Sequence, residues 1–261
     1  MNEHVQTFKD SMHNGDVLKA SLALHNIPDI NATYPELNGF NLLGYVLLKE
    51  SYDYAELLLK IGAEVDKRDR NQMTILHKLS REGCIGGVKF LLATGANINA
   101  ADIHCRRPLH WSIVFGYPHI SSFLINAGAD LNVRDIHDQT PLHLAVERAN
   151  MYVTKMLISH GADMNAEDSH GMRPLHYAVS KRSIEMAREL IVSGCEINMR
   201  EKYNTPLHQA ASLGEASMAR MLVNSGANPD AQDSVGRTPA DLARQYGHNR
   251  VADIITSKSV C

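Results

Sequence analysis

The chain has 261 residues, a formal net charge of −3 and 44% hydrophobic residues. A net negative charge argues against general nucleic-acid binding, which needs many cations to neutralise phosphates. The first six residues are too polar for a secretory signal, and no apolar run approaches the roughly 20 residues that span a bilayer. We therefore expect a soluble protein with no membrane insertion and no nucleic-acid partner.

Residues 1–35 predict a degenerate helical cap, after which two short motifs recur along the chain. Thr-Pro-Leu-His, or a variant that changes one position, starts at residues 74, 107, 140, 173 and 205. Gly-Ala-Asp-Leu-Asn and its variants start at residues 62, 95, 128, 161, 194 and 226. Regular self-similarity at this spacing predicts a stack of small units that bury a core only against their neighbours.

The motif spacing predicts seven units after the cap. Their predicted bounds are 36–68, 69–101, 102–134, 135–167, 168–200 and 201–232, followed by a C-terminal capping repeat and tail over 233–261. The last unit has Asp241 in place of the motif histidine, and its final helix is polar, as expected of a unit that ends the stack. The unit from 201 is one residue short, so its turn at Lys202 and Tyr203 should be tighter than the others.

Residues 135–167 illustrate the structure expected of one unit. Thr140 should be the N-cap of a first helix and accept a backbone N–H, with Pro141 at the first helical position. A second helix over residues 152–159 should bury one apolar stripe. Gly161 should end it, because a left-handed residue at that position favours glycine.

Together the two motifs resemble those of the ankyrin-repeat family over nearly the whole chain. The resemblance implies an all-α solenoid of about seven helix-turn-helix units with short β-hairpin loops. It also implies that the motif histidine ties its helix to the adjacent hairpin backbone. A protein or peptide partner would then bind on the concave face, at hairpin tips and exposed positions of the first helices.

The histidines could indicate metal binding or acid–base catalysis, but their spacing favours a structural role. One motif histidine recurs per unit, roughly 10 Å from the next and too far to share a metal ion: His77, His110, His143, His176 and His208. No nucleophile has a recognisable base, and the recurring aspartates fit turns better than a catalytic pair. We therefore predict no enzyme activity, no cofactor and no metal site.

The cysteines indicate where the protein resides. Four of them occupy unrelated positions of the repeat and lack the spacing of metal ligands. Free thiols are typical of a reducing compartment. We expect a cytoplasmic protein, or a nuclear one.

Hairpin tips and exposed first-helix positions of the middle units carry apolar, aromatic and basic side chains. The expected partner contacts are Ile103, Arg106, Trp111, Val114, Phe115, Ile136, His137, Leu144, Arg148, His170, Met172, Tyr177, Lys181 and Tyr203. Trp, Tyr and Arg dominate binding hot spots. Two alternatives stay open: Trp111 and Tyr177 could pack structurally at a half-buried position, and the tip histidines could be ordinary solvated surface.

The same face is expected to gather positive charge. Its basic residues are Arg68, Arg70, Lys78, Arg81, Arg106, Arg134, Arg148, Lys181, Arg200 and Lys202, against Glu82, Asp138, Glu147 and Glu167. Such a field would steer an acidic segment toward it. We expect a scaffold, adaptor or occluding inhibitor, monomeric alone, that binds an acidic segment with apolar anchors. The alternative is a secreted bacterial or viral effector that imitates such adaptors in the host cytosol.

Three asparagines, Asn132, Asn165 and Asn198, share a further pattern. Each follows an acidic residue two positions earlier and a leucine eight positions earlier. This resembles the pattern that asparaginyl hydroxylases recognise in ankyrin repeats. The resemblance implies hydroxylation at these positions where the host has the enzyme.

Overall fold

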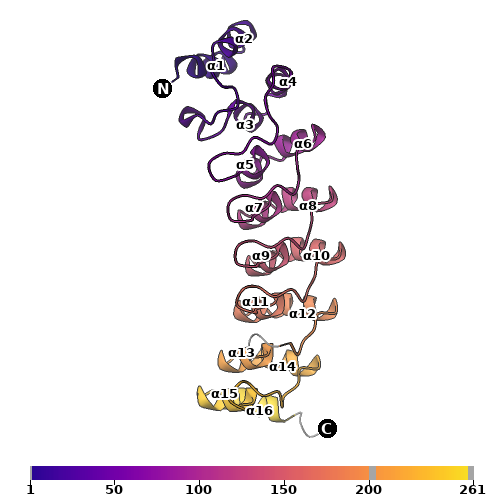
Figure 1. Ribbon diagram of the computed structural model, residues 1–261. Helices are drawn as coiled ribbons and strands as arrows, with labels where there is room; N and C mark the ends of the chain where they lie inside the picture. The colour runs from indigo at the N-terminus through magenta and orange to yellow at the C-terminus, as the bar shows by residue number, and fades with distance from the viewer. Residues whose placement is uncertain (1, 200–203, 258–261) are drawn as a thin grey trace. The chain divides into compact units, whose positions relative to one another are not determined.

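A computed structural model of the chain describes residues 2–199 and 204–257. These residues form sixteen α-helices and one 3-10 helix, and none of them forms an extended strand (Figure 1). The chain divides into two compact units, residues 1–120 and 121–261. This division falls within helix α8 (Pro118–Asn126) and is not a repeat boundary, so the predicted bounds of the repeats stay a prediction.

The first unit is built from short helices that pack in consecutive pairs. They are α1 (Glu3–His13), α2 (Val17–His25), η1 (Pro35–Leu37), α3 (Leu42–Leu48), α4 (Tyr52–Lys60), α5 (Ile75–Glu82), α6 (Ile85–Ala93) and α7 (Pro108–Val114). Helix α1 packs on α2, α3 on α4 and α5 on α6, while α3, α5 and α7 also pack on one another in that order. The first 35 residues thus contain a helix pair, and their role as a cap stays a prediction.

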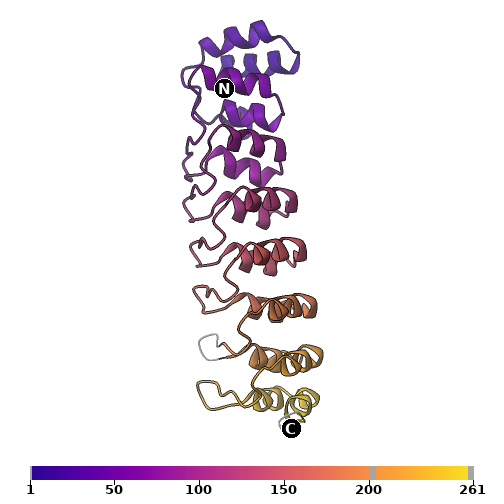
Figure 2. The ribbon, with the colours of Figure 1, turned by 90° about the vertical axis from the view of Figure 1, so that its right-hand side faces the viewer.

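The second unit repeats this arrangement. Its further helices are α9 (Pro141–Glu147), α10 (Met151–Ser159), α11 (Pro174–Ser180), α12 (Ile184–Val192), α13 (Pro206–Ser212), α14 (Ala216–Asn224), α15 (Pro239–Gln245) and α16 (Asn249–Thr256). The first helices α9, α11, α13 and α15 form one row, and the second helices α12, α14 and α16 pack in another. Within this unit the long loops that precede first helices extend away from the second row (Figures 1 and 2).

Leucines of the repeated motif form the centre of the core. Their exposed fractions are 2% or less: Leu76, Leu109, Leu142, Leu175 and Leu207. Burying one leucine side chain stabilises a fold by roughly 2 kcal/mol. The motif therefore recurs because each first helix needs one large apolar side chain at the same place.

Two first helices begin as the sequence predicts, because Thr205 Oγ1 accepts the His208 backbone N–H at 3.4 Å and Thr238 Oγ1 accepts that of Asp241 at 3.2 Å. Helix α9 adds a second contact. The Thr140 hydroxyl was expected to accept a backbone N–H, but it lies 2.8 Å from Nδ1 of His143. The same nitrogen accepts the Thr140 backbone N–H at 3.1 Å. Because His143 Nε2 lies 3.1 Å from the Met172 carbonyl, the ring carries its proton on Nε2 and uses Nδ1 as an acceptor. The imidazole thus joins Thr140 in a capping box at the start of α9, a role that the sequence analysis did not assign to it.

This arrangement survives where arginine replaces threonine. The backbone N–H of Arg107 donates to His110 Nδ1 at 3.1 Å, and that of Arg173 donates to His176 Nδ1 at 3.2 Å. Only the hydroxyl contact is lost at these positions. In the last unit, a carboxylate oxygen of Asp241 accepts the backbone N–H of the N-cap, Thr238, at 3.0 Å.

The second helix of the repeat over residues 135–167 ends as expected. Helix α10 ends at Ser159, and Gly161 has a φ of 88°. A side chain with a Cβ is disfavoured in this left-handed conformation, which explains the recurrent glycine. None of the described helices has the length and apolar character that crossing a membrane requires.

Candidate protein-interaction site

An aspartate holds in shape the loops before α5, α7, α9, α11 and α15. Asp102 Oδ1 accepts the backbone N–H groups of His104 at 2.8 Å and Arg106 at 2.9 Å. Asp168 Oδ1 accepts the equivalent two groups of its own loop at 2.8 and 2.9 Å. The recurring aspartates therefore organise turns, in line with their interpretation from the sequence.

In three repeats the second carboxylate oxygen of the aspartate binds the residue that follows the motif histidine. The pairs are Lys78 Nζ to Asp69 at 2.9 Å, Trp111 Nε1 to Asp102 at 2.9 Å and Tyr177 Oη to Asp168 at 2.7 Å. Sequence analysis missed these bonds. The signal was present, because each donor lies nine residues after its aspartate.

Two aromatic residues expected in the interface therefore also have a structural role. Trp111 stacks on Phe115 with ring centroids 5.5 Å apart, and the Arg106 guanidinium lies 5.7 Å from the Trp111 ring centroid. Tyr177 accepts a hydrogen bond from Gln139 at 2.6 Å. Burial and the bond with Asp168 raise the pKa of Tyr177. Both residues are half-buried. Their polar atoms bond the loop aspartates, so the alternative of a structural role holds for this end of each side chain.

The predicted contacts in the first unit form what we call the Trp111 patch. It comprises Ile103, Arg106, Trp111, Val114 and Phe115. Ile103 is 57% exposed and Phe115 is 49% exposed, whereas the other three are half-buried. Isolated exposed apolar residues are ordinary, but the stacked Arg106, Trp111 and Phe115 side chains form one continuous aromatic and cationic surface.

The predicted contacts in the second unit form what we call the Tyr177 patch. It comprises Ile136, His137, Arg148, His170, Met172, Tyr177 and Lys181. Ile136 is 51% exposed, and the two histidines, Arg148 and Lys181 are exposed. Leu144 was wrongly expected at the surface: it is 3% exposed, because its apolar side chain has no polar group to bond the loop aspartate and packs inward. Tyr203 lies outside the described residues.

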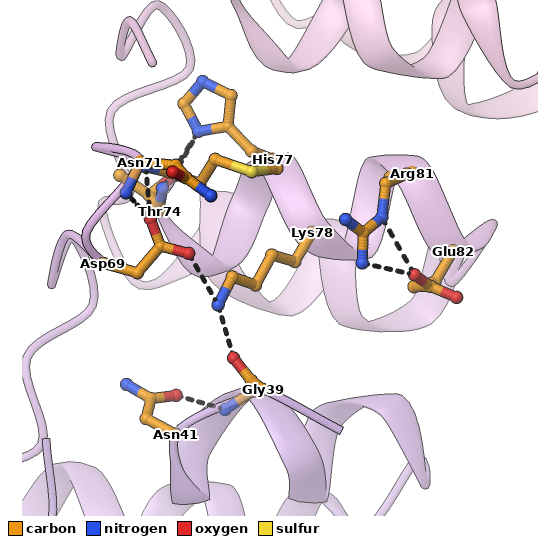
Figure 3. Close-up of polar contacts among 11 residues, drawn as sticks. Gly39, Asn41, Asp69, Asn71, Thr74, His77, Lys78, Arg81 and Glu82 are labelled. Atoms are coloured by element: carbon orange, nitrogen blue, oxygen red, sulfur yellow. Dashed lines mark hydrogen bonds and ion pairs between the residues drawn. The ribbon is translucent and has the colours of Figure 1, made fainter. Parts of the chain in front are cut away.

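The expected surplus of surface cations is smaller than the sequence suggested. Lys78 is only 8% exposed, since its ammonium donates to the Gly39 carbonyl at 2.5 Å and pairs with Asp69 (Figure 3). It also lies 5.6 Å from the Phe40 ring centroid. The space beside it is about 10 Å³, room for one water molecule at most, so the group is structural.

Other expected cations also have partners within the protein. Arg81 pairs with Glu82 at 2.8 Å, and Lys181 lies 3.7 Å from Glu147. Arg68 and Arg134 each donate to a backbone carbonyl at 2.6 Å. Arg200 and Lys202 lie outside the described residues. Among the described residues, Arg148 is exposed and forms no ion pair, so it is the clearest cation of the Tyr177 patch.

The motif histidines are buried, and Nε2 of His77, His143 and His208 connects consecutive repeats. Nε2 of His77 lies 3.1 Å from the Arg106 carbonyl, as expected from the family resemblance. Burial lowers the pKa of His77, His143 and His176, the last to about 4. The neutral imidazole is the form that can accept at Nδ1 while donating at Nε2. Across the residues that the structure describes, no group of three or more His, Cys, Asp or Glu side chains could hold a metal ion.

The three asparagines that resemble hydroxylation sites connect consecutive loops. Oδ1 of Asn132 accepts the backbone N–H of Asp163 at 2.8 Å, and Oδ1 of Asn165 accepts that of Glu196 at 2.9 Å. Asn198 accepts in the same way at 2.7 Å. Their side-chain amides therefore stabilise the contact between consecutive loops, and hydroxylation stays a prediction.

Comparison with protein families agrees with this geometry. The model for ankyrin repeats (3 copies) matches residues 10–102, 49–135, 109–201 and 188–260. Inversin of Gallus gallus and of Homo sapiens is 40% identical over 68 residues, which is 26% of this chain. That match spans 6% of inversin, so the chain corresponds to a small part of these relatives.

Solved structures show the same fold. The ankyrin repeat domain of Bcl-3, described as a unique member of the IkappaB protein family, superposes with a TM-score of 0.75 at 27% identity, over 82% of this chain and 96% of that domain. An ankyrin repeat domain from Acinetobacter baumannii AYE gives 0.66 at 27% identity, over 70% and 96%. The human ASB11 domain, at 22% identity, shares the fold with a TM-score of 0.70 over 82% and 97%. The chain belongs to the ankyrin-repeat family.

Proposed function

We propose that this chain is a non-catalytic recognition module that binds an acidic protein segment through the Trp111 patch and the Tyr177 patch. Ankyrin-repeat domains are protein–protein interaction modules, which supports the general part of this proposal. The observations that carry the specific part are the exposure of Ile103, Phe115 and Ile136 and the Arg106 guanidinium over the Trp111 ring, which stacks on Phe115. Apolar anchors would occupy these positions, and carboxylates would face Arg148.

The proposed mechanism is recognition without chemistry, in a scaffold, an adaptor or an occluding inhibitor. The chain would act as a monomer that offers preformed loops, because the loop aspartates already hold the tips in place. Free cysteines among the described residues, two of them buried, support a cytoplasmic or nuclear location. A secreted effector in a host cytosol would use the same surface and stays the alternative.

Exchanging single side chains tests the two patches. Phe115→Ala and Arg148→Glu should each lower the affinity for the native partner by roughly tenfold or more, as hot-spot truncation and charge reversal do. The partner is recovered by affinity purification from the native cell, identified by mass spectrometry and titrated as a pure protein. Arg250→Glu, an exposed arginine on α16, is the matched control and should leave the dissociation constant unchanged. Equal affinity of all three variants would refute the proposed surface.

A further inference from the structure

Two grooves lie between second helices of the second unit, in the row that faces away from the loops (Figure 1). The groove between α12 and α14 has a volume of about 300 Å³ and is lined by Ile184, Arg188, Ser217, Arg220 and Met221, among others. The groove between α14 and α16 has a volume of about 250 Å³, with Arg220 on one side and Ile254 on the other. Arg220 thus borders both grooves.

Two acidic side chains near these grooves form ion pairs, whereas the two arginines that line the grooves form none within the part of the chain that the structure describes. Glu189 of α12 pairs with Lys155 at 3.2 Å, and Glu215, before α14, pairs with Arg182 at 3.2 Å. Arg188 and Arg220 are exposed and form no ion pair within residues 2–199 and 204–257. The remaining acids of the three helices, Glu185 and Asp253, do not line either groove. The grooves therefore present positive charge without a compensating carboxylate.

Apolar side chains form the floor of each groove. In the groove between α12 and α14, Met221 is 7% exposed and Ile184 is half-buried. In the groove between α14 and α16, Val223 and Ile254 are half-buried. Val192, on the same helix as Arg188, is 81% exposed. An apolar floor with cationic edges is complementary to an amphipathic element that carries acids beside its apolar stripe.

We propose that the groove between α12 and α14 binds an amphipathic helix of a protein partner, with acidic residues on both flanks of its apolar stripe. Arg188 and Arg220 come from neighbouring helices, so they stand on opposite edges of the groove. A helix laid between them would place its apolar side chains on Ile184 and Met221 and its carboxylates on the two guanidinium groups. This surface is separate from the loops and first helices of the proposed function and stands independently of it.

Methyl NMR on the full chain locates this binding. The probe is a synthetic helical peptide of about four turns with leucines along one stripe and glutamates on both flanks. We expect saturable shifts of the Ile184 δ1-methyl and the Met221 ε-methyl, while the Ile103 and Ile136 methyls stay unchanged. The same peptide with lysines in place of glutamates should cause no shift. Shifts confined to Ile103 and Ile136, or no saturable shift, would overturn the proposal.

Charge reversal provides the second arm. The double variant Arg188→Glu, Arg220→Glu should bind the glutamate peptide with roughly tenfold or more lower affinity, whereas Arg250→Glu should change this affinity by less than about twofold. Thermal unfolding of each variant verifies that the fold is retained. Equal affinity for the double variant and the native chain would overturn the proposal. So would anionic phospholipid vesicles that reproduce the same methyl shifts, because they would assign the arginines to a membrane surface.

Discussion

Replacing Lys78 with methionine should lower the free energy of unfolding by about 3 kcal/mol. The side chains of Lys78 and Asp69 are only 10% and 14% exposed, and the lysine also bonds the Gly39 carbonyl (Figure 3). Methionine fills much of the same space but leaves the Asp69 carboxylate buried without its cation. Hydrogen bonds from Lys78 and from the Met73 backbone outweigh burial and hold the pKa of Asp69 below its ordinary value, so the charge persists at neutral pH. Urea unfolding followed by circular dichroism measures the loss.

A second lysine–carboxylate pair provides the control. Lys181 lies 3.7 Å from Glu147, and its side chain is 47% exposed. Lys181→Met should cost less than about 1 kcal/mol, because exposed ion pairs contribute little. If Lys78→Met lowered the free energy of unfolding no more than Lys181→Met does, the bonds of Lys78 to Gly39 and Asp69 would not be a structural link.

Lowering the pH from 7 to 4 should destabilise the fold through its buried histidines. Burial lowers the pKa of His77, His143 and His176 in the folded chain, whereas the unfolded chain titrates near 6.5. Below that value the unfolded state binds more protons, so stability is complete above about pH 6.5 and falls as the pH decreases. For His176, whose pKa is about 4, the loss reaches about 3 kcal/mol at pH 4.

The pH window separates this effect from carboxylate titration. Burial raises the pKa of Asp233, but its hydrogen bonds outweigh this effect and lower the pKa to about 2. The stability that this carboxylate contributes is therefore lost only in more acidic solution. Thermal unfolding at half-unit steps between pH 7 and 4 gives the profile. His176→Gln should flatten part of it, while His137→Gln, at an exposed position, should leave its slope unchanged. A level profile across this range would show that the histidines titrate normally.

The sequence was most informative where the same residue recurs. Leu142 and His143 could be assigned a buried structural role because their equivalents return in five successive repeats. A site that must pack against an identical neighbour tolerates few residue types, and this constraint makes helix pairs and the core predictable. The left-handed Gly161 followed for the same reason, since its backbone conformation excludes most side chains.

The sequence was least informative where the repeats differ. Lys78, Trp111, Leu144 and Tyr177 occupy one position of the repeat but have different chemistry, and only the structure shows that three of them bond a loop aspartate. Charge counting therefore overestimated the surface cations, because it could not tell the buried Lys78 from the exposed Arg148. The role of His143 at the helix start was also hidden, because threonine is the usual cap in such a sequence.

Site-specific photo-crosslinking in the native cell tests the central claim most directly, namely that the loops and first helices hold a protein partner. A photoreactive amino acid is placed at Phe115, at Ile136 and at Tyr152, a 55% exposed residue on α10 outside both patches. The account predicts that one protein is crosslinked from Phe115 and Ile136 and not from Tyr152. Crosslinking of that protein from Tyr152 alone, or equally from all three positions, would contradict it.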